Sequence, residues 1–384
     1  MAGTRILPRR LLQLFGSRIV HVLLIIAVLG FSTQFLIIYT SDPSFPPYRV
    51  RQPRITHRLD SSSIDWSEFK YVQYATSPES LCNAVMIWRD MEHIGSRGQR
   101  LMYYPSDWSV DEIDELTDGK HLTPIARLLH TAETEYYVKL RPIEELRLDQ
   151  KVEERWPEAY TSLLAFNLTE YKRVLVFDSG SLLKRNIDEL FLIPSAPVTM
   201  PYVYFGPAEG WKLSSSMVLI QPSTQAFVKV SKAVKEAKDD ESDVDILNKL
   251  YEGKISMLPQ RPYSLAAGEF RRQNHRAYLG NSYDSWDPDR VFEEAKFMHF
   301  FDEPMPKPWI RAPQMLLNKY MPQCSRSEWF GASDCRDRAM WFKLYSDYEE
   351  KRKAVCGAGF ELKDQALLFD PDVTLEDESH SDEV

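Results

Sequence analysis

AYTSLLAFNLTEYKRVLVFDSG, residues 159–180, is the stretch that decides the fold. Its first half places three large apolar residues, in LLAF, at helical spacing. Its second half, the predicted strand 173–178, is apolar at the four successive positions 174–177, which is typical of a strand buried on both faces at the centre of a parallel sheet. The stretch therefore predicts a helix that runs directly into a central strand, and the strand ends at Asp178.

Strand and helix patterns alternate on both sides of this stretch, which predicts a single α/β domain. A helix is expected to begin at Pro78, and a last helix is expected over residues 334–353 with Asp334 as its N-cap. Further strands are predicted at residues 70–76, 100–105, 136–140 and 215–223.

The N-terminal region predicts a membrane anchor. Residues 19–39 carry no charge and are long enough to cross about 30 Å of hydrocarbon. Arginines abut the span on its N-terminal side and start only ten residues beyond it on the other, which favours a cytoplasmic N-terminus. We therefore predict a single-pass type II protein.

The predicted parts of the chain follow from these patterns. Residues 1–18 form a cytoplasmic tail, 19–39 the signal anchor, 40–66 a proline-rich lumenal stem and 67–360 the globular domain. Residues 361–384 form an acidic tail that is expected to be disordered.

The charge distribution argues against a nucleic-acid-binding protein, and the cysteine spacing argues against a zinc or redox site. Most of the net charge of −9 comes from seven acidic residues between Asp370 and Glu383, so the near-neutral body gives no electrostatic footprint for nucleic acid. The four cysteines lack the spacing of a zinc site or a redox motif. In a lumenal domain a bridge between Cys324 and Cys335 is the simplest expectation, and free buried thiols are the alternative.

Three clusters offer groups for chemistry at strand and helix ends. Asp178 follows the central strand, where ligands of α/β sheets bind, and a carboxylate there can hold a divalent cation. His299 is expected on a strand, with Lys307 eight residues later in a proline-rich loop, as a metal ligand and a phosphate contact. Asp243, with Asp245, opens a predicted helix and could contact a donor sugar. Each group also has a purely structural alternative. Asp178 could form a turn, His299 could be a core residue, and Asp243 with Asp245 could stabilise the N-terminus of the helix.

Several motifs, in a fixed order along the chain, indicate one protein family in which all three clusters would belong to a single site. The chain resembles the family 8 glycosyltransferases, a retaining group with the GT-A fold that includes glycogenin, and within it a fungal Golgi N-acetylglucosaminyltransferase branch. The motifs that carry the resemblance are YVQYATSPESLCNAVM, AYTSLLAFNLTEYKRVLVFD, NIDELFLIPSAPVTMP, SMVLIQPS, DVDILNKLY, LPQRPYSLAAGEFR, WDPD, HFFDEPMPKPW and DCRDR.

The resemblance implies a role for each candidate residue. It makes Asp178 and His299 ligands of Mn²⁺ or another divalent cation. It makes Lys307 a diphosphate contact and Asp243 a donor-sugar contact at the catalytic centre. The remaining donor-binding residues that it implies are Tyr74, Thr76 and Ser77 around the uridine, and Ser214 and Ser215 in the sugar pocket.

Two positions depart from the family pattern. The second carboxylate of the Asp-x-Asp metal motif is Gly180 here, and a lysine expected in the helix before the central strand is Ser162. Losing one carboxylate weakens a metal site with few protein ligands, and losing a cation weakens phosphate binding.

The resemblance implies transfer of a sugar, N-acetylglucosamine from its UDP donor, to a mannose-containing glycan in the Golgi lumen. Another UDP-sugar donor is one alternative, and a catalytically impaired binding or scaffold protein is the other, which Gly180 and Ser162 favour. The sequence indicates neither the acceptor glycan nor an oligomeric state.

Overall fold

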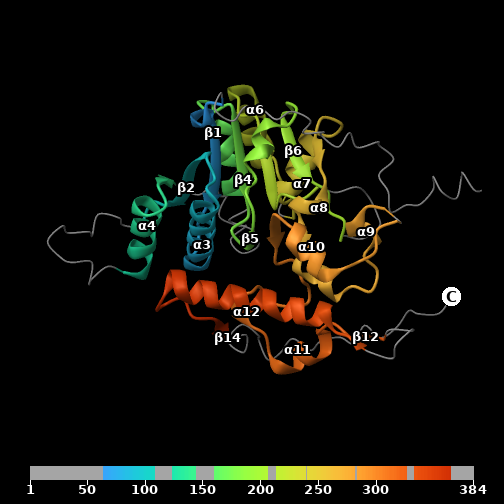
Figure 1. Ribbon diagram of the computed structural model, residues 1–384. Coiled ribbons are helices and arrows are strands. Elements are labelled where there is room, and N and C mark those ends of the chain that lie inside the picture. The colour runs from blue at the N-terminus through green and yellow to red at the C-terminus, as the bar shows by residue number, and fades with distance from the viewer. Residues whose placement is uncertain are drawn as a thin grey trace, which may run out of the picture. The chain divides into compact units, whose positions relative to one another are not determined.

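A mixed sheet with strand order β3-β2-β1-β4-β7-β6-β8 forms the centre of the computed structural model (Figure 1). The structure describes residues 64–108, 123–143, 160–205, 213–238, 240–281, 283–326 and 333–364. They all lie within one compact unit, Val50–Val384. The strands are β1 (Phe69–Tyr74), β2 (Gln99–Pro105), β3 (Val138–Ile143), β4 (Arg173–Phe177), β6 (Val198–Pro201), β7 (Met217–Ile220) and β8 (Ser256–Leu258).

The predicted central strand is confirmed. Every residue of β4 is buried, and β4 pairs parallel with β1 and antiparallel with β7. Its side chains alternate between two apolar layers: Leu175 and Phe177 belong to one core cluster, and Val174 and Val176 to the other. A strand that feeds two cores needs apolar residues at every position, which is why the sequence shows no polar face here.

Helices cover both faces of the sheet. Helices α3 (Pro78–Ile94), α4 (Pro124–Thr134) and α12 (Arg336–Cys356) supply side chains to the core with Leu175. The 3₁₀ helix η3 (Ser162–Asn167), α6 (Thr224–Lys235) and α7 (Asp243–Leu250) supply the core with Val174. The smaller helices are η2 (Trp66–Glu68), η4 (Asp188–Leu192), α8 (Gln260–Tyr263), η5 (Ala267–Arg271), α9 (Arg276–Leu279), α10 (Pro288–Glu294) and α11 (Gln314–Tyr320).

The strand order predicts a ligand crevice at one edge of the sheet. From β1 the chain moves outward through β2 to β3, and then returns to place β4 on the other side of β1. In open α/β sheets, ligands bind in a crevice outside the carboxyl ends of the strands, at the point where the strand order reverses. The crevice therefore lies at the carboxyl ends of β1 and β4.

A second, three-stranded sheet lies beside this crevice. It consists of β5 (Ser181–Leu183), β10 (Phe297–His299) and β9 (Leu265–Ala266). The antiparallel register places His299 opposite Ser181, which follows the β4 loop directly. The segment LPQRPYSLAAGEFR supplies β9, which supports β10 from its other side. Two-stranded pairs complete the structure: β11 (Ile310–Arg311) with β14 (Lys363–Asp364), and β12 (Ser325–Arg326) with β13 (Ser333–Asp334).

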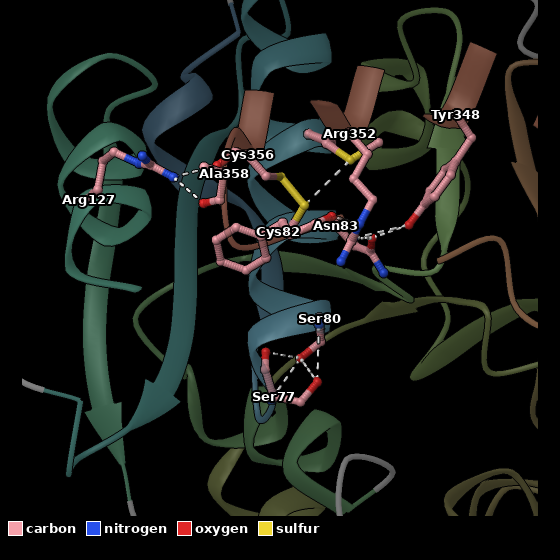
Figure 2. Close-up of a disulfide and its surroundings, with 11 residues drawn as sticks. Ser77, Ser80, Cys82, Asn83, Arg127, Tyr348, Arg352, Cys356 and Ala358 are labelled. Carbon is pink, nitrogen blue, oxygen red and sulfur yellow. Dashed lines mark hydrogen bonds between the residues drawn. A yellow bond between two sulfur atoms is a disulfide. The ribbon is translucent and has the colours of Figure 1, made fainter. Parts of the chain in front are cut away.

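Helix α12 is fastened to α3 by a disulfide that the sequence did not predict. Figure 2 shows Cys82 of α3 bonded to Cys356 at the end of α12, with Tyr348 and Arg352 donating to the Asn83 side chain. The predicted Cys324–Cys335 bridge is confirmed. Because all four cysteines are paired, the alternative of free thiols is wrong.

Two predicted helices differ from the structure. The last helix begins at Arg336 with Cys335 as its N-cap, because Asp334 pairs in β13 and its carboxylate binds the Arg336 backbone and guanidinium. The predicted N-cap role of Asp334 is therefore wrong. Within residues 160–171 the helix is a 3₁₀ helix, whose period of three fits the spacing of buried Leu163 and Phe166.

Several predicted segments lie outside the described residues. These are the cytoplasmic tail 1–18, the anchor 19–39, most of the stem 40–66 and most of the acidic tail 361–384. None of the helices in the described ranges combines the length and apolar character needed to cross a membrane.

Candidate functional site

The predicted site residues gather at the crevice between β1 and β4. Val72 is paired with Val176, so Tyr74 at the end of β1 lies level with Asp178 just after β4. Thr76 and Ser77 continue from β1 into helix α3. The side chains expected around a uridine and those expected around a metal thus belong to neighbouring strand ends, as the topology requires.

The start of helix α3 is built from a pair of serines. Ser77 is the N-cap, its Oγ accepts from the Ser80 amide, and the Ser80 hydroxyl accepts from the Ser77 amide (Figure 2). This capping box fixes the turn in which Thr76 lies. Thr76 Oγ1 is buried and has no hydrogen-bond partner, so Thr76 keeps an unused polar atom next to the crevice.

The loop after β4 is closed by Asp178 itself. One carboxylate oxygen accepts from the Gly180 amide at 3.0 Å, and the Asp178 amide donates to the Ser216 carbonyl at 2.9 Å. Gly180 has no positive φ, so its backbone does not require glycine. A Cβ at this position would lie 3.3 Å from Asp178 Oδ2 and 3.4 Å from the Trp309 ring, which shows how closely Trp309 covers the loop.

His299 is buried beside this loop, and its Nε2 has no hydrogen-bond partner. The Phe300 amide, next in the chain, donates to the Gly180 carbonyl at 3.3 Å. Burial, together with the nearby Lys307 charge, lowers the pKa of His299 to about 3. The imidazole is therefore neutral near pH 7, the form in which histidine binds metals.

Asp243 lies at the first turn of α7 and is almost fully buried. Its two oxygens accept from Ser162 Oγ at 3.2 Å and from Ser215 Oγ at 3.3 Å. Burial raises the pKa of Asp243 to about 6; the helix amide and the two hydroxyls oppose this, and the Asp178 charge adds to it. Asp243 is thus held by neutral donors.

Ser214 and Lys307 complete the predicted set. The Ser214 hydroxyl bonds Ser216, and its amide donates to Pro201, so Ser214 shapes the turn before β7. Lys307 is exposed, and its carbonyl accepts from the Ile310 amide. Its charge helps to lower the pKa of His299.

Asp178 and His299 offer one carboxylate and one neutral imidazole, a donor pair that suits Mn²⁺. The unbonded, buried Nε2 of His299 fits a ligand role. Across the described ranges, no group of three or more His, Cys, Asp or Glu side chains could hold a metal ion. A cation here would need further oxygen ligands from a bound diphosphate.

Sequence reasoning missed two contacts of this site. Ser162 was recognised only as a missing lysine, whereas it donates to Asp243 across 81 residues of chain. Trp309 belongs to the motif HFFDEPMPKPW but was given no role, and it covers the Asp178–Gly180 loop. The position of Trp309 two residues after Lys307 could have indicated that it lies near the site. Nothing in the sequence indicated the contact between Ser162 and Asp243.

Similarity to known proteins identifies the family. No protein-family model matches the chain. Among solved structures, the bifunctional glycosyltransferase WbbM has a TM-score of 0.49 at 13% identity, covering 76% of this chain and 50% of its own. The galactosyltransferase LgtC has a TM-score of 0.42 at 12% identity, covering 71% and 95%.

Curated relatives are much closer in sequence. Glucose N-acetyltransferase 1 of Gibberella zeae is 38% identical over 296 residues, which cover 76% of this chain and 63% of that protein. The protein of the same name from Aspergillus fumigatus is 37% identical over 317 residues, which cover 79% of this chain and 81% of the relative. With this identity across most of both chains, the protein belongs to the glucose N-acetyltransferase 1 family.

Proposed function

We propose that the protein transfers N-acetylglucosamine from UDP-N-acetylglucosamine to a mannose-containing glycan, with retention of configuration. The relatives are named glucose N-acetyltransferase 1. Glucose has no nitrogen to acetylate, so the N-acetyl group in that name belongs to the transferred sugar. The prediction of an N-acetylglucosamine-transferring enzyme is confirmed at the level of the family.

The observation that carries the proposal is the convergence at the crevice. Asp178, an unbonded His299 nitrogen and Asp243 come from β4, β10 and α7, and they meet where a doubly wound sheet binds ligands. The crevice also has Thr76 and the start of α3 on its other side. Such an arrangement suits a nucleoside diphosphate-sugar.

Each side chain then has a task. Thr76 and Ser77, with Tyr74, hold the uridine, and Ser214 and Ser215 shape the sugar pocket. Asp178 and His299 would hold a divalent cation, Mn²⁺ by its donor preference, and that cation would supply positive charge beside the diphosphate. Lys307 places an ammonium beside the same phosphates. Asp243 accepts hydrogen bonds from the donor sugar while Ser162 and Ser215 orient its carboxylate.

We also propose a Golgi membrane location with the catalytic domain, residues 67–360, in the lumen. Two disulfides support an oxidising compartment, since such bonds are rare in the cytosol. The charge-free residues 19–39 would be the anchor and residues 40–66 the stem.

Release of UDP tests the function. The full-length protein is incubated with Mn²⁺, an oligomannose acceptor and each of UDP-N-acetylglucosamine, UDP-glucose, UDP-galactose and UDP-glucuronate. We expect acceptor-dependent turnover with UDP-N-acetylglucosamine, and its loss in Asp243→Asn. Turnover with a different donor would correct the sugar, and tight donor binding without turnover would support a binding protein.

A further inference from the structure

A hollow of about 370 Å³ lies at the amino ends of β1 and β2, the opposite edge of the sheet from the crevice. Lys70 near the start of β1 is paired with Gln99 at the start of β2, and both line the hollow. At about 3.3 Å per residue, roughly 13 Å separates Lys70 from Tyr74 along β1. The hollow is therefore distinct from the proposed donor site.

The lining of the hollow is strongly basic. It includes Lys70, Lys139, Arg97 and Arg100 but only one acid, Glu92. Arg100 is ion-paired with Glu92, and Arg97 with Asp188 at 3.7 Å. Neither Lys70 nor Lys139 has a carboxylate within 4.0 Å in the part of the chain that the structure describes.

Lys70 is the unusual member, because it is only 2% exposed. Its ammonium donates to the Gln99 amide oxygen at 3.2 Å and lies 5.0 Å from the centre of the Tyr171 ring. Burial, followed by the charges of Lys139 and Arg141, lowers the pKa of Lys70 to about 8, and the charge of Glu170, which is ion-paired with Arg141, opposes this shift. A buried cation near two further cations is costly unless an anion compensates for it.

Tyr137 gives independent support at the rim of the hollow. It has φ of 54°, the one positive φ among the described residues other than glycine, and its side chain is 74% exposed. A backbone in this region is strained for a residue other than glycine, and such residues are concentrated at functional sites. Arg100 helps to fix the turn by donating to the Tyr136 carbonyl at 2.6 Å. The result is an aromatic side chain standing beside a basic hollow.

We propose that this hollow binds a phosphomonoester carried on a polyol ring, with Lys70 and Lys139 on the phosphate and Tyr137 against the ring. The volume is larger than a bare phosphate needs and is within the range of small-ligand sites. A sugar phosphate of a glycan and a phosphoinositide headgroup share this chemistry. Charge-assisted hydrogen bonds to two ammonium groups supply the affinity.

Titration calorimetry on the full-length protein in detergent tests the proposal. The probes are inorganic phosphate, mannose 6-phosphate, unphosphorylated mannose and dioctanoyl phosphatidylinositol 4-phosphate, each with and without excess UDP. We expect saturable binding of the phosphorylated probes, at least tenfold tighter than that of mannose and unchanged by UDP. Tighter binding of mannose 6-phosphate assigns the glycan source, and tighter binding of the short-chain lipid assigns the headgroup.

Three substitutions sharpen the test. Lys70→Met and Lys139→Glu should each weaken binding at least tenfold, the value expected for losing a charged hydrogen bond. Lys139 is exposed, so Lys139→Glu keeps the test valid if Lys70→Met folds poorly. Lys184→Met is the matched control, because Lys184 is half-buried and, like Lys70, has a pKa lowered to about 8, but it lies outside the hollow and bonds the Phe292 carbonyl.

Four results would overturn the proposal: no saturable binding of a phosphorylated probe, displacement by UDP, affinity unchanged in both hollow variants, or an equal loss in Lys184→Met. Because the readout needs neither turnover nor a donor sugar, its failure is distinguishable from failure of the proposed function.

Discussion

Asp243 is a buried carboxylate whose partners are hydroxyl and amide groups, not cations. An unfolded aspartate ionises near pH 4, whereas folded Asp243 has a pKa of about 6. Between these values the folded state keeps a proton that the unfolded state has lost, so stability falls as the pH rises from 4 to 6. At pH 7 the charged Asp243 therefore lowers the free energy of unfolding by about 2–3 kcal/mol.

Asp243→Asn should remove this cost. We expect the variant to be more stable than the wild type at pH 7 by about 2 kcal/mol, with the advantage vanishing near pH 4, because an amide does not ionise. Urea unfolding of metal-free protein at both pH values measures the difference. The same pH dependence in both proteins would show that Asp243 does not titrate in this window.

Gly180 is the position where a single change could restore a metal ligand. Its φ does not require glycine, and the nearest atoms to a Cβ there are Asp178 Oδ2 at 3.3 Å and the Trp309 ring at 3.4 Å. Gly180→Asp should therefore fold after a small shift of Trp309 and should bind Mn²⁺ at least tenfold more tightly in the presence of UDP, because a hard oxygen ligand is added. Gly180→Ala is the control, since it adds the Cβ without a carboxylate. Equal Mn²⁺ affinity in the two variants would mean that this position does not face the cation.

For single residues, the sequence predicted those candidate site residues whose place is set by the local strand pattern. Asp178 follows an apolar strand and His299 lies on a short strand, and the structure brings both to the crevice. The contact of Ser162 with Asp243 could not be predicted, because it joins positions 81 residues apart with no shared local pattern.

At the scale of elements, the disulfides make an unequal contribution. In the chain-entropy model, cross-linking a longer loop removes more freedom from the unfolded chain. Cys82–Cys356 spans 274 residues and Cys324–Cys335 spans 11, which corresponds to about 6 and about 3 kcal/mol. The double variant Cys82→Ala, Cys356→Ala should thus lose more stability than Cys324→Ala, Cys335→Ala.

Thermal unfolding of the two double variants beside the wild type measures this difference. A lower melting temperature for the variant without the Cys324–Cys335 bridge would contradict it. Tyr348 and Arg352 also hold α12 against α3 through Asn83. Because the disulfide acts on the unfolded chain, the larger loss is expected even when these contacts keep α12 in place.

Element boundaries were predictable where side-chain chemistry is local. Pro78 at the first turn and Ser77 as the N-cap place the start of α3. The predicted start of α12 was wrong because the Asp334 side chain pairs with Arg336 and its backbone belongs to β13. Strand β13 pairs with β12 next to the Cys324–Cys335 disulfide. The Cys82–Cys356 bond was missed because spacing does not show which distant helices pack together.

At the scale of the whole molecule, alternating patterns predicted an α/β domain, and the parallel strands of the sheet agree. The order β3-β2-β1-β4 was not predictable from those patterns, since side-chain alternation gives burial and not neighbours. This strand order determines where the candidate site lies, because it places the ends of β1 and β4 beside each other.

The proposed topology gives a test on intact membranes. With residues 1–18 outside and the domain in the lumen, protease added to sealed microsomes should leave the domain intact, and detergent should expose it. Digestion of the domain without detergent would contradict the lumenal assignment.

The most direct test of the donor site is the affinity for UDP, with and without Mn²⁺, in wild-type protein and His299→Ala. The neutral, unbonded His299 nitrogen is the observation that most favours a metal-dependent site. We expect Mn²⁺ to increase UDP affinity at least tenfold in the wild type and to have no effect in His299→Ala, while the metal-free affinities of the two proteins are equal. The same Mn²⁺-dependent gain in both proteins would contradict it.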